Sequence, residues 1–392
     1  MYDVVISGSG PAGSKCAEIV ARSGFKVALL EKNSTWRKPC GGAVSSRVFK
    51  YYPQLRKLNF LPITGISLYS SDFIQLEYSW EEIREPSMTV DRLEFDTLIR
   101  DIAVDAGAEL FDKNYSYDFF YKNNNKIGIK TRTPKGTNEF LGKLLIIADG
   151  MSSKLAIKSG LREKWKIDEI GLAKCAILEG KNTIDPSRIS LFFKKYKGYG
   201  WIFPLDETHF NIGCGTWLEA NQQINLNQAY LEFLNEPFLK KFFPKKNYKV
   251  IWEGAYPLPA LGVKDKSLFG ENLMIIGDAA GFVSPISGEG IHASIVSGYA
   301  AGKTAIEALT DDNISQQTLK KYKSYPNIRK MRRNFKMTAS MVNFFYENEG
   351  INLSNMFKLA ASDQQLREMT INMFLFSQPP SREFLSRLKA MK

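Results

Sequence analysis

The strongest constraint on the fold lies in the first 31 residues of the chain. An apolar run at Asp3–Ser7 precedes a G-x-G-x-x-G pattern over residues 8–13. A helix is expected over Ala12–Ser23, and the run KVALLE at 26–31 is expected to form the next strand. A strand, a glycine-rich turn, a helix and a second strand in this order predict a dinucleotide-binding βαβ unit.

Each residue type in this unit has a chemical purpose. Gly8 permits the tight turn, Gly10 lets the backbone approach a pyrophosphate, and Gly13 lets the helix pack closely on the strand. The free N–H groups at the start of the helix bind phosphate. Glu31 ends the second strand, where its carboxylate can accept the hydroxyl groups of an adenosine ribose, which disfavours NADP at this site. Cys16, within the helix, is expected to pack in the core.

Three later segments carry further motifs. Arg92 and Asp96 begin an expected amphipathic helix, the strand KLLIIADG ends in Asp149-Gly150, and the strand NLMIIGD ends in Gly277-Asp278. Asp-Gly and Gly-Asp pairs are common at turns. Their order after the first glycines, however, resembles the three FAD fingerprints of the para-hydroxybenzoate hydroxylase superfamily.

That resemblance implies one dinucleotide site, occupied by FAD. It implies that Asp278 holds the ribityl chain and that Arg92 lies near the FAD phosphates. It also implies that the helix after Gly288-Glu289-Gly290 points its amino end at the flavin, which stabilises negative charge on the reduced ring. The cofactor-binding residues expected on this basis are Gly8, Gly10, Ala12, Gly13, Glu31, Lys32, Cys40, Gly41, Gly42, Arg92, Asp149, Gly150, Gly277, Asp278, Pro285, Gly288, Gly290 and Ile291.

Two shorter motifs narrow the resemblance further. The stretch KPCGGAVS around Cys40 and the stretch YGWIFP at 199–204 are similar to the P-C-G-G and Y-x-W-x-F-P motifs of the geranylgeranyl reductase family. The family often has a proline three residues before the tyrosine, where this chain has Tyr196. The resemblance extends from residue 2 to about residue 310 and implies FAD-dependent saturation of isoprenoid chains in archaeal-type membrane lipids or their precursors.

Reduction of an isolated C=C bond needs a hydride and a proton donor close to the alkene. We expect Cys40 to be either that donor or relay, or a small neutral contact to the flavin. Gly41 and Gly42 would let the chain pass close to the flavin ring. Tyr199 and Trp201 either line a lipid tunnel, where aromatic faces stabilise positive charge, or pack in the core of a strand.

Two other functions share part of this pattern. A flavin monooxygenase acting on an aromatic compound or quinone carries the same three fingerprints. An electron-transfer flavoprotein would need the cysteines of an iron–sulfur cluster, and the four cysteines show no such set. NADPH, a ferredoxin and a reduced quinone all stay open as electron donors. His209 is expected to be peripheral and His292 to be structural, and no metal site is expected.

The predicted fold class is α/β (α+β), with a Rossmann-like FAD domain, an antiparallel sheet domain and a helical C-terminal region. Sequence patterns assign residues 1–50, 88–155 and 265–320 of the chain to the FAD domain. Residues 51–87 and 156–264 are assigned to the substrate domain, and residues 321–392 to the helical region. Alternating strands expected at 63–78, 173–180, 188–195, 200–217 and 249–259 would form one wall of an apolar substrate cavity.

The chain is basic, with 53 Lys and Arg against 41 Asp and Glu, a net charge of +12. No nucleic-acid-binding motif accompanies this charge, so no nucleic-acid partner is expected. The Met- and Phe-rich C-terminal segments are expected to pack in the core. Alternatively, Arg329, Lys330, Arg332 and Arg333 meet anionic lipid. No signal peptide or membrane span is recognised, which predicts a cytoplasmic protein, peripheral on the membrane at most.

Overall fold

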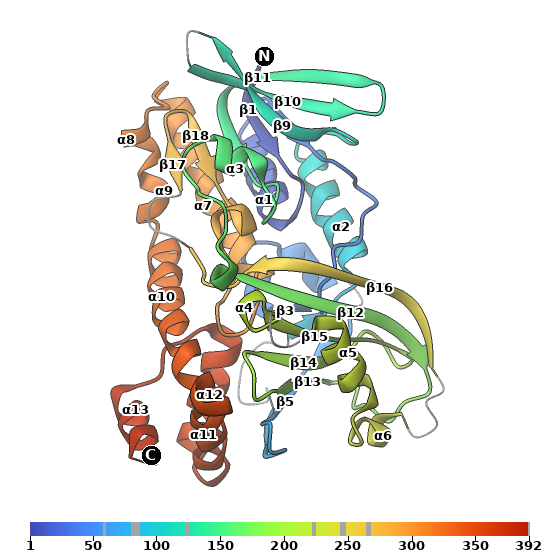
Figure 1. Cartoon of the computed structure of the whole chain (residues 1–392). Coiled ribbons are helices and arrows are strands. Elements are labelled where there is room, and N and C mark those ends of the chain that lie inside the picture. The colour runs from blue at the N-terminus through green and yellow to red at the C-terminus, as the bar shows by residue number, and fades with distance from the viewer. Residues whose placement is uncertain are drawn as a thin grey trace.

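The computed structural model describes residues 1–57, 60–79, 87–122, 125–221, 225–243, 248–263 and 268–390. Two large sheets and a group of C-terminal helices make up the molecule (Figure 1). None of the helices within these ranges combines the length and the apolar character that a membrane span requires.

The first sheet is built on the predicted βαβ unit, which consists of β1 (Tyr2–Ser7), α1 (Pro11–Arg22) and β2 (Val27–Leu30). Strand β1 is buried over its last four residues and lies between two parallel neighbours, as its continuous apolar run predicts. The strand order is β17-β18-β11-β1-β2-β8, and β10 and β9 extend from β11. The other strands are β8 (Glu109–Phe111), β9 (Tyr115–Lys122), β10 (Asn125–Thr133), β11 (Gly136–Ile147), β17 (Phe269–Gly270) and β18 (Leu273–Ile275).

Three helices pack together beside this sheet: α1, α2 (Arg92–Asp105) and α7 (Ile291–Thr310). The small residues of α7 let it approach α1 very closely. A Cβ atom added at Gly298 would lie 2.2 Å from the carbonyl oxygen of Ala12. Asp91 caps α2 by accepting a hydrogen bond of 2.8 Å from the backbone N–H of Leu93. Cys16 is fully buried in α1, as expected.

The second sheet has the strand order β16-β12-β15-β14-β13-β5-β6. The prediction of a wholly antiparallel sheet is wrong at one place, because β5 and β13 are parallel. The chain joins these two strands through most of the first sheet, and such a long crossover allows parallel pairing. The strands are β5 (Gly65–Tyr69), β6 (Gln75–Ser79), β12 (Ile170–Gly180), β13 (Arg188–Phe193), β14 (Gly198–Pro204), β15 (His209–Trp217) and β16 (Tyr248–Pro259).

The two faces of this second sheet bury different partners. One face packs with α5 (Leu226–Asn235) around Phe210, Ile212 and Phe233. The opposite face contributes Leu191, Trp201 and Phe203 to a core that it shares with the C-terminal helices. Because side chains alternate along each strand, neighbouring residues point to opposite faces of the sheet. Each strand therefore contributes side chains to both cores.

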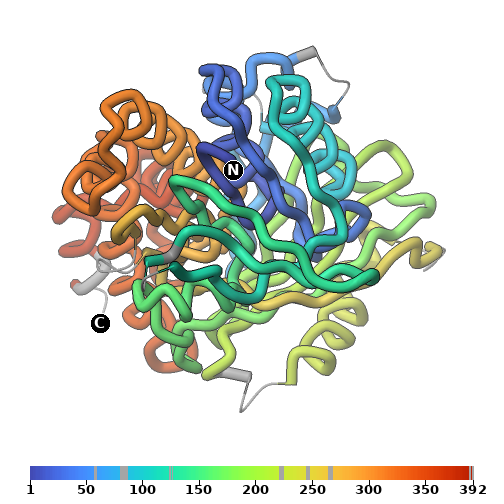
Figure 2. Tube along the Cα trace, turned by 90° about the horizontal axis from the view of Figure 1, so that it is seen from above, coloured from blue at the N-terminus to red at the C-terminus, as the bar shows by residue number. Residues whose placement is uncertain are grey.

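The C-terminal region is helical, as predicted, and several of its Met and Phe residues, such as Met356, Phe357 and Phe374, pack in that shared core. Figure 2 shows the last part of the chain, in orange and red, gathered on one side of the molecule. The helices are α10 (Pro326–Tyr346), α11 (Ile351–Ser362), α12 (Gln364–Phe376) and α13 (Arg382–Lys389). Shorter helices are α3 (Lys154–Lys158), α4 (Leu218–Asn221), α6 (Leu239–Phe242), α8 (Gln316–Leu319) and α9 (Lys321–Ser324).

A small third sheet, absent from the sequence predictions, fixes the segment after Cys40. It consists of β3 (Ala43–Val44), β7 (Ser87–Thr89) and β4 (Pro62–Ile63), with β7 in the middle. Only two residue pairs join each pair of strands, which is too little pairing to recognise from sequence. The three-domain division stays a proposal, and its boundary at 264/265 lies outside the described residues.

Candidate active site

A single continuous cavity of about 430 Å³ runs between the first sheet, the second sheet and the C-terminal helices. Its wall includes all the residues predicted to bind the cofactor except Gly13, together with Cys40, Tyr199 and Trp201. Gly13 lies directly behind Gly8, one layer away from the cavity. The structure therefore gathers residues from distant parts of the sequence at one site.

The three fingerprint glycines differ in what they leave room for. A Cβ atom at Gly8 would lie 2.4 Å from the Ala148 carbonyl oxygen, and one at Gly13 would lie 1.8 Å from the Gly8 carbonyl oxygen. Gly8 also has φ of +100°, which side chains rarely adopt. At Gly10, by contrast, a Cβ atom would meet no described atom within 4 Å. Gly8 and Gly13 are thus required by the protein's own packing, whereas Gly10 leaves space on the cavity side.

The start of α1 and the end of β2 meet at this place. Gly10 is the N-cap of α1 and Pro11 is its first residue, so no side chain caps the N–H groups of the first turn. Glu31 follows β2, and its Oε2 atom accepts hydrogen bonds from the Ser9 backbone N–H at 3.0 Å and the Ser9 hydroxyl at 2.8 Å. These contacts hold the carboxylate beside the start of α1, which is where the sequence predicts that the adenosine ribose binds. Lys32, the next residue, lies on the cavity wall with its ammonium group over the Trp36 ring.

Asp149 follows the end of β11 at the centre of the wall, and Gly150 turns the chain with φ of +83°. The Oδ1 atom of Asp149 is buried without a hydrogen-bond partner among the described residues. Burial raises the pKa of this carboxyl group to about 6, although a hydrogen bond from Ser153 and the charge of Arg162 oppose the shift. An acceptor left unpaired in this way is a feature that a bound ligand can satisfy.

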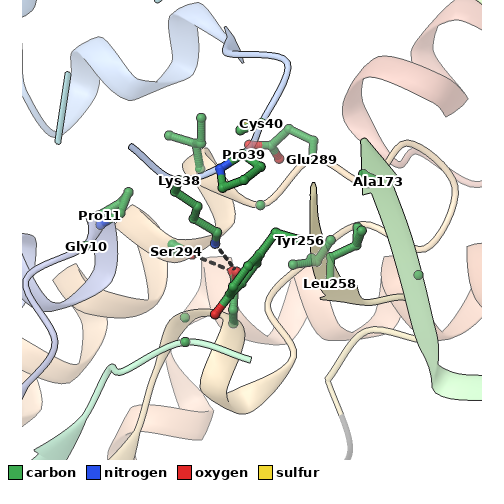
Figure 3. Close-up of a pocket in the computed structure, with 18 of the residues that line it drawn as sticks. Gly10, Pro11, Lys38, Pro39, Cys40, Ala173, Tyr256, Leu258, Glu289 and Ser294 are labelled. Carbon is green, nitrogen blue, oxygen red and sulfur yellow. Dashed lines mark hydrogen bonds and ion pairs between the residues drawn. The ribbon is translucent and has the colours of Figure 1, made fainter. Parts of the chain in front are cut away.

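Asp278 lies in the short turn after β18 and is paired with a residue that the sequence analysis missed. The Lys38 ammonium group contacts its Oδ2 atom at 2.5 Å, and the Ser294 hydroxyl lies 3.4 Å from its Oδ1 atom (Figure 3). Burial opposes the charge on Lys38, but Asp278 outweighs burial and raises the pKa of this lysine. Figure 3 also shows the Tyr256 ring beside the Lys38 side chain. Lys38 stands two residues before Cys40, so the P-C-G-G motif itself pointed to this segment.

Arg92 begins α2 and is 5 % exposed. Its guanidinium group forms an ion pair with Asp96 at 2.8 Å, and the Cys40 side chain is close enough to affect its charge. Burial disfavours the charged arginine, yet Asp96 and Cys40 together raise its pKa. Arg92 thus brings a fixed positive charge to the cavity wall, next to the thiol.

The loop before α7 supplies Pro285, Gly288, Glu289 and Gly290 to the wall, and Ile291 begins the helix. The resemblance implies that this helix terminus points at a flavin. In the structure, the Glu289 carboxylate accepts a hydrogen bond of 2.6 Å from the His292 N–H. Burial raises the pKa of Glu289, and the charge of Arg47 opposes that rise. Because a carboxylate at a helix N-terminus offsets the helix dipole, Glu289 reduces the positive potential available to a ligand there.

Cys40 is half-buried between the two sheets, and the Gly42 N–H lies 3.5 Å from its sulfur. The structure gives a further reason for the two glycines. A Cβ atom at Gly41 would lie 2.5 Å from the Phe203 ring, and one at Gly42 would lie 2.2 Å from the Val90 carbonyl oxygen. Gly42 also has φ of +81°. Both glycines are therefore needed for the loop to pack on the second sheet and on the segment after β7.

Tyr199 and Trp201 lie on β14 and both line the cavity. The Tyr199 hydroxyl donates to the Ser287 carbonyl oxygen and so connects the second sheet to the loop before α7. Burial raises the pKa of Tyr199. Trp201 is 5 % exposed and donates its indole N–H to Asn211 at 2.8 Å. Both residues are therefore packed on β14 and also line the cavity, and their role toward a lipid stays a prediction.

The far end of the cavity is apolar, and much of it comes from helices that carried no recognisable motif. This apolar end is formed by Ile189, Leu191, Ile286, Val342, Phe345, Leu353, Phe374, Leu375 and Phe376. The Met- and Phe-rich pattern of the C-terminal segments predicted burial, but it did not indicate that one buried face lines a cavity. Aliphatic and aromatic walls of this kind suit a hydrocarbon chain.

The positions of the two histidines agree with the sequence-based expectation. His209 lies on the surface and contacts Asp206 at 2.8 Å. His292 is packed in the first turn of α7, and burial together with Arg47 lowers its pKa to about 3, so it is neutral at ordinary pH.

These observations define a class of protein, namely an FAD-binding enzyme. The space at Gly10, the uncapped start of α1, the Glu31 carboxylate and the unpaired Asp149 oxygen all fit the group. A family model described as an FAD binding domain matches residues 1–331.

Relatives define the family. A digeranylgeranylglycerophospholipid reductase of Methanosphaera stadtmanae is 31 % identical over 335 residues, covering 82 % of this chain and 79 % of that protein. Another of Methanocaldococcus jannaschii is 31 % identical, covering 82 % and 81 %. The chain belongs to the family of FAD-binding digeranylgeranylglycerophospholipid reductases.

Solved structures show the same fold. A geranylgeranyl bacteriochlorophyll reductase-like protein of Thermoplasma acidophilum aligns with a TM-score of 0.83 and 23 % identity, covering 100 % of this chain and 99 % of the other. A flavin-dependent brominase aligns with a TM-score of 0.76 and 20 % identity, covering 100 % and 98 %.

Proposed function

We propose that this protein is an FAD-dependent reductase that saturates C=C bonds of geranylgeranyl chains in archaeal-type ether lipids or their precursors. The observation that carries the proposal is the continuity of the cavity. It joins the nucleotide-binding motifs of the first sheet to the apolar end at α10–α12, with Cys40 between them. The names of the relatives agree with this substrate class.

The polar end of the cavity would hold FAD. The uncapped start of α1 would receive its pyrophosphate, and Glu31 would accept hydrogen bonds from its ribose. Asp149 and Asp278 would accept further hydrogen bonds, and Lys38 would then exchange part of its contact with Asp278 for the cofactor. When bound, FAD supplies the hydride that C=C reduction requires.

The protein's own residues would supply the proton and the environment. Cys40 lies between the polar and apolar ends, where its thiol can serve as donor or relay. The positive charge of Arg92 near Cys40 would favour the thiolate left after proton transfer. Tyr199 and Trp201 present aromatic faces to the same space, where they would stabilise positive charge on the alkene carbon and exclude water.

An anaerobic turnover experiment tests the proposal. The purified protein is reduced with dithionite and mixed with a geranylgeranylated ether lipid, and flavin absorbance and product mass are followed together. Flavin reoxidation with a gain of two hydrogens for each reduced bond is the expected result. Reoxidation that occurs only with oxygen, with an oxygenated product, would instead establish the monooxygenase alternative. Repeating turnover with NADPH, reduced ferredoxin or a reduced quinone identifies the donor.

We also propose that the protein docks on the membrane surface through α10. Arg329, Lys330 and Arg333 are exposed on this helix, whereas Arg332 is half-buried. Basic side chains near a membrane attract anionic lipid. Co-sedimentation with vesicles containing phosphatidylglycerol, weakened by salt and by Arg333→Glu, is the expected result. Equal binding to neutral vesicles would contradict it.

A further inference from the structure

The buried amide of Asn211 joins the two segments that carry the family motifs. Asn211 lies on β15, opposite Phe203 of β14, and is 4 % exposed. Its Nδ2 atom donates to the Cys40 carbonyl oxygen at 3.0 Å, and its Oδ1 atom accepts the Trp201 indole N–H at 2.8 Å. One side chain therefore contacts both the P-C-G-G loop and the aromatic strand.

The amide of Asn211 matches the hydrogen-bonding chemistry of both partners. An indole N–H can only donate and a backbone carbonyl can only accept, so the group between them must accept on one side and donate on the other. A carboxylate would satisfy Trp201 but repel the Cys40 carbonyl. A leucine of similar size would satisfy neither, leaving the Trp201 indole N–H unpaired and the Cys40 carbonyl with only the weak Cys175 thiol donor.

The surroundings of Trp201 are shaped to fit this contact. A Cβ atom at Gly213 would lie 2.3 Å from the Trp201 ring, and one at Gly41 would lie 3.0 Å from its indole nitrogen. The ring thus occupies space left by glycines of β15 and of the Cys40 loop. The Cys175 thiol, 3.7 Å from the Cys40 carbonyl oxygen, is a further donor from the second sheet to the same oxygen.

We propose that Asn211 is a positioning residue, which fixes the Cys40 loop against Trp201 and so sets the thiol at its place in the cavity. Its catalytic consequence rests on the proposed function, while its structural consequence does not. Loss of the amide would release the loop without removing any group that contacts the substrate.

Alkylation of Cys40 tests the structural consequence in the FAD-loaded protein. Cys40 is half-buried, whereas Cys16, Cys175 and Cys214 are at most 1 % exposed, so iodoacetamide should modify Cys40 first. Mass spectrometry then measures the rate at which Cys40 is alkylated. We expect Asn211→Leu and Asn211→Asp each to raise it roughly tenfold, the size of effect that loss of one buried hydrogen bond produces.

Asn352→Leu is the matched control. Asn352 is another fully buried amide, which donates to the Phe344 carbonyl oxygen at 2.6 Å on the C-terminal helices. Its replacement should leave the Cys40 alkylation rate unchanged. An equal rise in this control, or an unchanged rate in both Asn211 variants, would overturn the proposal. If Asn211→Leu fails to fold, Asn211→Asp decides, since it keeps the acceptor for Trp201.

Lipid turnover tests the catalytic consequence. Both Asn211 variants should lower kcat roughly tenfold with little change in the lipid KM or in FAD content, because only the thiol is displaced. A change in KM or FAD content alone would contradict positioning. If the unaltered protein does not reduce the lipid, the proposed function fails by itself, and the alkylation rates still decide the role of Asn211.

Discussion

The two ends of the cavity are built in different ways. The polar end uses backbone turns and carboxylates at the ends of parallel strands, and most of its residues belong to short local motifs. The apolar end uses side chains from one sheet face and from three consecutive helices, α10–α12, which are far from that sheet in the sequence. A single substitution should therefore abolish binding at the polar end but only reshape the apolar end.

The largest effect is expected at Gly8. In Gly8→Val, the new side chain would clash with the Ala148 carbonyl and strain a backbone with φ of +100°, so FAD binding should be lost entirely. The flavin absorbance of the purified protein, relative to its protein absorbance, measures this. Gly10→Ala is the control, because no described atom lies within 4 Å of its new Cβ. Gly10→Ala should fold normally and bind FAD more weakly. An unchanged FAD affinity would mean that the pyrophosphate does not approach Gly10.

Cys40 lies where the two ends meet. Cys40→Ser should retain FAD while C=C reduction falls by roughly 10²–10⁴-fold, the range for loss of a positioned proton donor. Single-turnover reoxidation of the reduced flavin by a geranylgeranyl lipid is the measurement. Full turnover with normal flavin content would show that Cys40 is only a small neutral contact.

Asp149 makes the polar end sensitive to pH. Burial raises its pKa from 3.8 to about 6, so the native protein binds more protons than the unfolded chain between these values. Its contribution to stability therefore falls as pH rises through this window. Relative to its effect at pH 3.5, Asp149→Asn should stabilise the FAD-free protein at pH 7.5 by about 3 kcal/mol. Urea unfolding at both pH values checks this, and an equal change at both would rule out a raised pKa.

The smallest effect is expected at the apolar end. Val342 lines the cavity from α10 and is 2 % exposed. Val342→Phe would fill part of the space for the lipid, at a cost of about 1–3 kcal/mol for overpacking. The KM for a geranylgeranyl lipid should rise about tenfold, while FAD content stays constant. If Val342→Phe lost both its FAD and its lipid turnover, the polar and apolar ends of the cavity would not be independent.

The βαβ unit, FAD as cofactor and the family were accessible from sequence because their signals are local. Residues 8–13 and Glu31 are fixed by one turn, one helix and one strand, and the stretch around Cys40 is a short motif. Lys38 stood within that motif but carried no signal of its own, because its partner Asp278 is 240 residues away. The parallel pairing of β5 with β13 was missed for the same reason.

The sequence by itself determined the nucleotide-binding unit, the candidate thiol and the alternation of the second sheet, since periodicity and turn residues act over a few positions. Only the tertiary structure decided which helices close the apolar end, which carboxylate caps α7 and which amide joins Cys40 to Trp201. Those contacts depend on how two sheets and a helical region pack against one another. Asn211, one polar residue in a buried strand, becomes informative only once its two partners are beside it.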